Sequence, residues 1–272
     1  MSIHLENLRV ATYNIHKGVQ GVGMGRRLEI HNLGLAVEQF DADIVCLQEV
    51  RKLHRREANH FSRWPDLPQA DFLAPPGYES VYRTNAVTRH GEHGNALLSR
   101  WPVLRHQHED MSDHRFEQRG LLHAELVVRD QPVHVVVAHL GLIPASRRRQ
   151  AEHICRFVAR EVPADVPVIV AGDFNDWGAQ VERTFAAIGL VSIKKPSALT
   201  YPSRLPLVQL DCVYARGLMP QQVEVPRGRA WHRMSDHLPL IAEFRWPQPS
   251  LPHRPAMATS ALAARSHQRA SA

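Results

Sequence analysis

The sequence has few cysteines, no long apolar run and no recognisable leader. Its three cysteines, Cys46, Cys155 and Cys212, are widely spaced and form no Cys-x-x-Cys pair. This spacing excludes a disulfide scaffold and a zinc knuckle, and it indicates buried thiols in a reducing compartment. No window approaches about 18 uncharged apolar residues, and the N-terminus lacks the features of a secretory signal. We therefore expect a cytoplasmic protein without a transmembrane segment.

Acidic residues are missing from the end of the chain, from residue 248 onward. The whole chain has 33 Lys and Arg against 27 Asp and Glu, a net charge of +6. Without that segment, which holds three arginines, the counts are 30 and 27, a net charge of +3. A mildly basic body is compatible with a polyanionic partner. Residues 247–272 are rich in Pro, Ala, Ser and Arg, so we predict a domain at 1–246 and a disordered tail.

Strands dominate the predicted secondary structure. Three amphipathic helices are expected over Leu28–Phe40, Pro144–Glu161 and Gln180–Ile188. The stretch Arg51–Pro76 is long, basic and irregular, and we expect a functional or mobile loop there. Neighbouring strands that form antiparallel pairs favour packed sheets flanked by helices over a doubly wound parallel sheet. The predicted strands are Leu8–Ile15, Asp43–Val50, Tyr78–Arg83, Gly94–Arg100, Leu121–Arg129, Pro132–Leu140, Pro167–Asp173, Val208–Ala215 and Leu238–Phe244.

Polar residues recur where these apolar strands begin or end. Each has an ordinary structural explanation when taken alone: Asn14 can satisfy a turn, His139 can be a core histidine, and Asp211 can pair with an arginine. Buried carboxylates are costly unless they are paired or bound to a metal. Several of them at strand ends therefore suggest one shared cation site. The residues concerned are Asn14, Glu49, His139, Asp173, Asn175, Asp211, Asp236 and His237.

Seven short motifs resemble those of the endonuclease/exonuclease/phosphatase superfamily, the fold of deoxyribonuclease I. Each motif is weak alone, but their order along residues 8–245 is specific. The resemblance implies an α+β fold, a four-layered α/β sandwich of two packed, mainly antiparallel β-sheets flanked by helices. The motifs are Thr12-Tyr13-Asn14-Ile15, Leu47-Gln48-Glu49, the run from Gly94 to Arg100, His139-Leu140, Gly172-Asp173-Phe174-Asn175, Leu210-Asp211 and Ser235-Asp236-His237.

The resemblance also implies a divalent metal ion. Glu49 resembles the family's metal ligand, with Asn14 and Asp236 lining the same site. Oxygen ligands of this kind fit Mg²⁺, with Mn²⁺ as a substitute.

The remaining motif residues resemble catalytic groups. Asp173 matches the residue that orients or deprotonates the attacking water, and Asn175 matches the amide that bonds the scissile phosphate. His237 matches the histidine beside the phosphate, with Asp211 as its orienting carboxylate. His139 stands where the abasic-site endonucleases have a tyrosine, which disfavours that branch.

Two basic stretches could bind a polyanion. The first turn of a predicted helix contains three arginines, Arg147, Arg148 and Arg149. They form either a phosphate-binding rim or a solvated basic face of the helix. Basic residues alternate with aromatic ones between Arg51 and Trp64, which could contact nucleic acid or a lipid surface.

The combined pattern predicts metal-dependent hydrolysis of a phosphodiester, either in nucleic acid or in a phospholipid headgroup. Metal ions, imidazolium and amide donors stabilise the negative charge that builds up when a nucleophile approaches such an ester. The alternatives are a phosphomonoesterase acting on a soluble polyphosphate and a non-catalytic binding module on the same fold. An inactive module would be expected to have lost some of these residues, and all are present.

Overall fold

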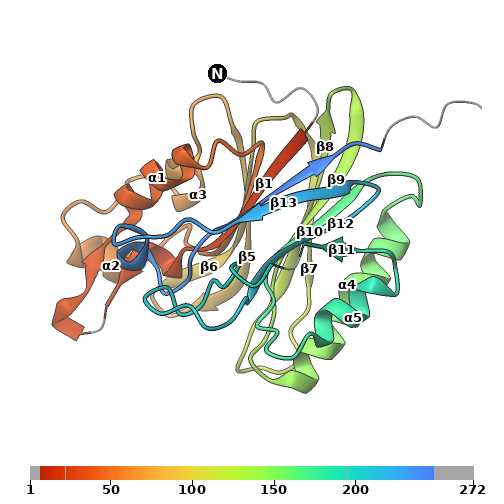
Figure 1. The fold of residues 1–272 in the computed structure, drawn as a ribbon. Coiled ribbons are helices and arrows are strands. Elements are labelled where there is room, and N and C mark those ends of the chain that lie inside the picture. The colour runs from red at the N-terminus through yellow and green to blue at the C-terminus, as the bar shows by residue number, and fades with distance from the viewer. Residues whose placement is uncertain (1–6, 22, 194, 248–272) are drawn as a thin grey trace, which may run out of the picture.

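The computed structural model describes residues 7–21, 23–193 and 195–247, which form two packed six-stranded sheets (Figure 1). In spatial order the first sheet comprises β13 (Met219–Glu224), β14 (Leu240–Arg245), β1 (Asn7–Asn14), β4 (Ile44–Val50), β6 (Gly91–Ser99) and β5 (Glu79–Thr88). The second comprises β11 (Val191–Ser192), β12 (Asp211–Arg216), β10 (Val168–Asp173), β9 (Gln131–His139), β8 (Gly120–Val128) and β7 (Val103–Asp110). Among these strands only the pairs β1–β4 and β9–β10 are parallel.

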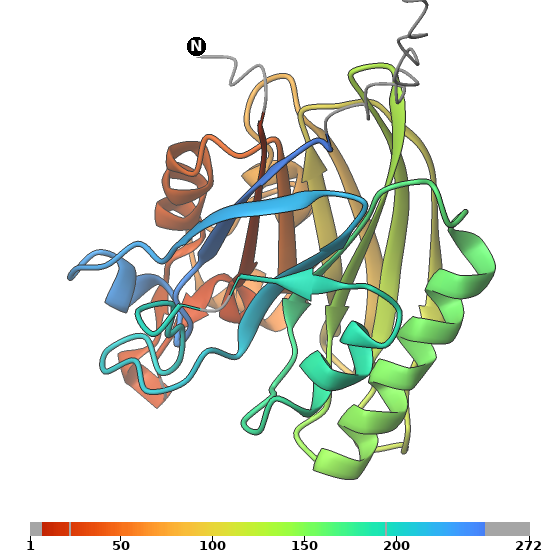
Figure 2. The same ribbon diagram turned by 45° about the vertical axis from the view of Figure 1, so that its right-hand side comes forward.

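Helices cover the outer face of each sheet, as the two views show (Figures 1 and 2). The first sheet carries α1 (Ile30–Gln39), α3 (Gln69–Leu73) and α6 (Trp231–Met234), and the second carries α4 (Pro144–Glu161) and α5 (Gln180–Ala186). Short elements complete the chain: α2 (Arg55–His60), η1 (His16–Gly18), η2 (Gly23–Gly25), and the pair β2 (Val19–Gln20) and β3 (Arg27–Leu28). The predicted α+β sandwich of helix, sheet, sheet and helix is confirmed.

The central strands are apolar on both faces because both faces are covered. In β1, Leu8 and Val10 face the core between the sheets, whereas Ala11 and Tyr13 face the helices of the first sheet. Strand β10 divides its apolar residues in the same way. Covered strands of this kind form continuous apolar runs in the sequence. All nine predicted strands are present, including the edge strand β5, which is less completely covered.

Some predicted elements differ from the structure at places where the local pattern is weak. The stretch 51–76 is not a single irregular loop, because α2 and α3 lie within it. Helix α2 is held by tertiary contacts, since Glu57 pairs with Arg26 and Arg51. The edge strands β7 and β13 were not predicted, because they are polar and largely exposed. Strand β12 begins at Asp211, later than expected.

Two further expectations concern the C-terminal segment and membrane-spanning helices. The predicted tail at 247–272 lies outside the described residues except for Pro247, so the domain boundary at 246 stays a prediction. In the part of the chain that is described, no helix is long and apolar enough to cross a membrane.

Gly172 allows β9 and β10 to approach closely beside the site. A Cβ atom at this position would lie 1.8 Å from the carbonyl oxygen of Ala138, which is main chain and cannot rotate away. We expect Gly172→Ala to lower the free energy of unfolding by about 1–3 kcal/mol, measured by urea denaturation. Gly178→Ala is the control, because nothing lies within 4 Å of the added methyl group. Equal unfolding midpoints for the two variants would contradict this account.

Candidate active site

The candidate site forms where strand ends of the two sheets meet. In the second sheet the register pairs Asp173 with His139 on one side and with Asp211 on the other. In the first sheet, β1 ends at Asn14. The segment before β14 supplies His237, and this segment is tied to β1 because the Ser235 hydroxyl donates to the main-chain oxygen of Asn14 at 2.7 Å. Four strand ends and one loop therefore converge.

The Asp173 carboxylate is the centre of this group of residues. Its Oδ2 accepts a hydrogen bond from Asn14 Nδ2 at 3.1 Å, and it lies 3.4 Å from His139 Nε2 and 3.6 Å from His237 Nε2. Its Oδ1 accepts from the main-chain N–H of Asn175 at 3.0 Å. The side chain of Asp173 is buried. We call Asn14, His139, Asp173, Asn175, Asp211 and His237 the acid–histidine cluster.

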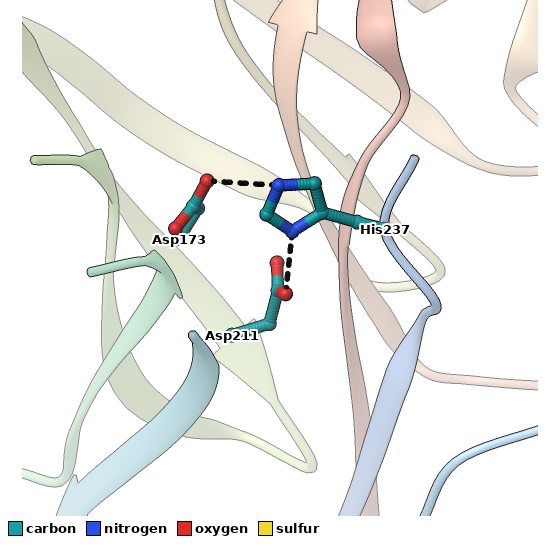
Figure 3. Close-up of side chains that lie close together, drawn as sticks. All are labelled: Asp173, Asp211 and His237. Carbon is teal, nitrogen blue, oxygen red and sulfur yellow. Dashed lines mark hydrogen bonds and ion pairs between the residues drawn. The ribbon is translucent and has the colours of Figure 1, made fainter. Parts of the chain in front are cut away.

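His237 lies between two buried carboxylates (Figure 3). Its Nδ1 is 2.8 Å from Asp211 Oδ2, and its Nε2 points to Asp173. A bond from Nδ1 to a carboxylate fixes the orientation of the ring and so keeps Nε2 directed at Asp173. Tyr201 supports the ring from one side, with ring centroids 4.9 Å apart.

The cluster shifts the protonation of its members in different directions. Burial raises the pKa of Asp173 to about 7, helped by Asp211 and opposed by His237. Burial alone would lower the pKa of His237, but the charges of Asp211 and Asp173 raise it to about 10. Burial, with Arg119 nearby, holds the pKa of His139 well below its usual value. At neutral pH the cluster therefore contains one charged and one neutral histidine.

Glu49 and Asp236 form a second group with the residues that follow Asn14. Lys17 Nζ lies 2.7 Å from Glu49 Oε2, and His16 Nδ1 lies 3.1 Å from Asp236 Oδ1. Burial opposes ionisation of Glu49, yet the charge of Lys17 and its hydrogen bond hold the pKa of Glu49 well below the usual range. Glu49 has a φ of 56°, a left-handed conformation that is costly for a non-glycine residue and is found mainly where the surrounding structure enforces it.

The donors present fit a divalent cation. Glu49 and Asp236 offer carboxylate oxygens, and Mg²⁺ and Mn²⁺ prefer oxygen ligands. Asn14 can add its side-chain Oδ1, which also accepts from the main-chain N–H of His16 at 3.1 Å. Asp236 is partly exposed, and Glu49 is held ionised, so both can bind a cation. A second donor set consists of Asp173, Asp211 and His237, whose ligand atoms lie within 4.8 Å of one another. In that set, however, His237 Nδ1 already bonds Asp211.

The three arginines predicted to bind substrate do not act as one surface. Arg147 is buried, and its guanidinium donates to the carbonyl oxygens of Gly141 and Leu142. Arg149 forms an ion pair with Asp113. Only Arg148 extends into solvent with a single long contact, 3.9 Å to Glu152. Arg147 thus braces the segment that follows His139, whereas its two neighbours lie on the surface.

Several site residues were not predicted. Lys17 pairs with Glu49, and His16 pairs with Asp236. The only sequence signal for these pairs is the position of Lys17 and His16 shortly after Asn14. Ser235 belongs to a recognised motif, but its bond to β1 depends on tertiary structure. Asn95, also in a motif, is structural: its amide donates to the carbonyl oxygens of Gly120 and Val137 in the opposite sheet.

The fold is that of the deoxyribonuclease I-like class of proteins. The family model described as "Endonuclease/Exonuclease/phosphatase family" matches residues 11–237. The chain therefore belongs to this family, whose members are generally hydrolases of phosphoesters and typically depend on divalent metal ions.

Individual relatives agree with this assignment. Protein YbhP of Escherichia coli K12 is 37% identical over 246 residues, 88% of this chain and 96% of that protein. The endonuclease/exonuclease/phosphatase of Beutenbergia cavernae shares the fold with a TM-score of 0.72 at 22% identity, covering 89% of this chain and 72% of that one. The human Nocturnin catalytic domain with bound sulfate gives a TM-score of 0.67 at 19% identity, with coverage of 91% and 96%.

The opposite pKa shifts of the two histidines are measurable by NMR in the presence of a chelator. We expect His237 to remain protonated at pH 8 and His139 to be neutral at pH 6. Because folding raises the pKa of His237 from 6.5 to about 10, its charged form stabilises the fold fully below pH 6.5 and ceases to do so as the pH rises through 10. Asp211→Asn should lower the pKa of His237, and Asp165→Asn, on the exposed turn before β10, should not. A wild-type His237 that titrates below pH 7 would refute this assignment.

Proposed function

We propose that this protein is a divalent-metal-dependent phosphodiesterase, acting on nucleic acid or on a phospholipid headgroup. The observation that carries the proposal is the buried Asp173 carboxylate, which contacts an amide and two histidines at the edge of the sandwich. A catalytic base and a cationic group held side by side are what hydrolysis of an anionic ester requires.

Asp173 and His237 have complementary roles in this proposal. Asp173, whose pKa is raised to about 7 by burial, accepts a proton from the attacking water as the water oxygen bonds to phosphorus. His237 is charged at neutral pH and presents Nε2 to the phosphoryl oxygens, where negative charge builds up. Asp211 keeps the His237 ring charged and oriented.

The amides and the remaining histidine position the ester. Asn14 donates to Asp173 and so fixes the direction of the carboxylate. Asn175 has a φ of 48°, and its side-chain amide donates one hydrogen bond to the carbonyl oxygen of Leu140. The second N–H of the same amide is left for a phosphate oxygen. His139 is neutral and lies beside this group, with Nε2 3.4 Å from Asp173 Oδ2. These contacts bind the phosphate without adding a second full positive charge.

Glu49, Asn14 and Asp236 are the residues that would hold the metal ion. Bound there, Mg²⁺ or Mn²⁺ supplies a positive charge beside the phosphate that offsets charge on the departing oxygen. Lys17 neutralises Glu49 when no cation is bound, and His16 Nδ1 contacts Asp236.

The metal requirement is testable with bis(p-nitrophenyl) phosphate, a small soluble diester. We expect hydrolysis with Mg²⁺ or Mn²⁺, its loss in excess chelator, and recovery when the metal is restored, because the donors are oxygen atoms. Glu49→Gln should raise the metal concentration needed for half-maximal rate. Undiminished hydrolysis in excess chelator would exclude the metal from the mechanism.

The catalytic assignments are tested by Asp173→Asn and His237→Ala. Each should lower kcat by at least about a hundredfold, the low end of the contribution of a positioned acid or base. Asp165→Asn is the matched control, because Asp165 is exposed at the opposite end of β10. A rate near that of the wild type in either variant would remove that residue from the mechanism. A phosphomonoester, p-nitrophenyl phosphate, assayed alongside tests the alternative of a phosphomonoesterase.

A further inference from the structure

Large apolar side chains are exposed around the candidate site. Of the thirteen exposed large hydrophobic residues in the described ranges, six lie on four loops that follow or precede strands of the second sheet at the site end. These loops are 111–119, 140–143, 174–179 and 195–210. Their exposed fractions run from 49% to 82%. We call these six residues the apolar rim: Phe116, Leu142, Ile143, Trp177, Leu205 and Leu207.

The apolar rim is connected to the acid–histidine cluster through Tyr201. The Trp177 ring lies 6.3 Å from that of Tyr201, which itself contacts His237. The main-chain N–H of Leu207 donates to the Tyr201 carbonyl oxygen at 2.8 Å. Leu142 follows β9 closely, and its N–H donates to Glu117 in the loop that carries Phe116. Figures 1 and 2 show the loops 140–143, 174–179 and 200–210 at the end of the sandwich remote from residue 7.

The charges of the same loops favour an anionic partner. The acidic residues are engaged within the protein: Asp113 pairs with Arg149, Glu117 pairs with Arg119, and Asp176 accepts from main-chain N–H groups at the start of α5. Two arginines of these loops are exposed and have no ion pair among the described residues, Arg115 and Arg204. Arg115 lies over the exposed Phe116 ring, 4.7 Å from its centroid.

We infer that the apolar rim docks on an anionic phospholipid bilayer and presents a headgroup phosphodiester to Asp173 and His237; this inference rests on the proposed function. An apolar surface with outward-facing arginines suits the boundary between headgroups and acyl chains, where apolar burial and attraction to anionic lipid act together. Four of the six rim residues are aliphatic. Aliphatic side chains gain from contact with acyl chains but offer no ring on which nucleic acid bases can stack, which disfavours a single-stranded nucleic acid.

The test compares two full-length variants in vesicle sedimentation. The rim variant carries Leu142→Ser, Ile143→Ser, Leu205→Ser and Leu207→Ser. The control variant removes four exposed apolar side chains from other faces: Leu35→Ser, Leu104→Ser, Val191→Ser and Met219→Ser. Vesicles contain phosphatidylcholine, alone or mixed with phosphatidylglycerol, and a fluorescent single-stranded oligonucleotide is the alternative ligand. Both variants keep the basic C-terminal residues, so the contribution of these residues to vesicle binding is the same in each. Melting temperatures of the two variants verify that they are folded.

We expect the wild type to bind the anionic vesicles, the control variant to bind as the wild type does, and the rim variant to bind at least about tenfold more weakly. Wild-type protein should also release a headgroup product from the mixed vesicles. Equal binding by a folded rim variant, or wild-type binding to the oligonucleotide but not to vesicles, would overturn the inference. Hydrolysis of bis(p-nitrophenyl) phosphate without vesicle binding leaves the proposed function intact. Vesicle binding without any diester hydrolysis contradicts the proposed function alone.

Discussion

The structure depends on compensating two carboxylates that are buried at the meeting point of its sheets. Asp173 and Asp211 are almost completely inaccessible, and a buried charge without partners is strongly destabilising. Their partners come from both sheets, because Asn14 belongs to β1 and His237 to the loop before β14. The hydrogen bond of Asp173 to Asn14 and that of Asp211 to His237 therefore form only when the two sheets are packed together. The packed sandwich is a condition for the assembled site.

This constraint also gives two identical functional groups different chemistry. The His237 ring separates the carboxylates, with Asp211 on Nδ1 and Asp173 on Nε2. Asp211 is oriented toward the His237 ring, whereas Asp173 also faces Asn14 and His139. Environment rather than residue type therefore distinguishes the carboxylate that holds the histidine from the one whose pKa is raised to about 7 by burial. Asp173 and Asp211 are buried and offer no surface to a large partner. The exposed apolar loops beside them provide such a surface.

The central strands could be predicted from the sequence because covered strands are apolar on both faces, and α4 was predicted with its observed bounds. The edge strands β7 and β13 could not, since half-exposed polar strands look like loops. The convergence of Asp173, His139 and Asp211 follows from strand ends and is visible in the sequence. The pairing of Lys17 with Glu49 and the burial of Arg147 depend on how loops pack, which has no periodic signature. Exposure of Leu205 and Leu207 is likewise a property of the folded loops.

Strand β14 pairs with β13 on one side and with β1 on the other, so the first sheet is completed by the strand that is translated last among those described. His237 precedes β14 by only a few residues and is positioned by it. During synthesis on the ribosome, Asn14, Glu49 and Asp173 therefore emerge before His237, which completes the acid–histidine cluster. The order of the strands thus delays assembly of this cluster until β14 has been synthesised.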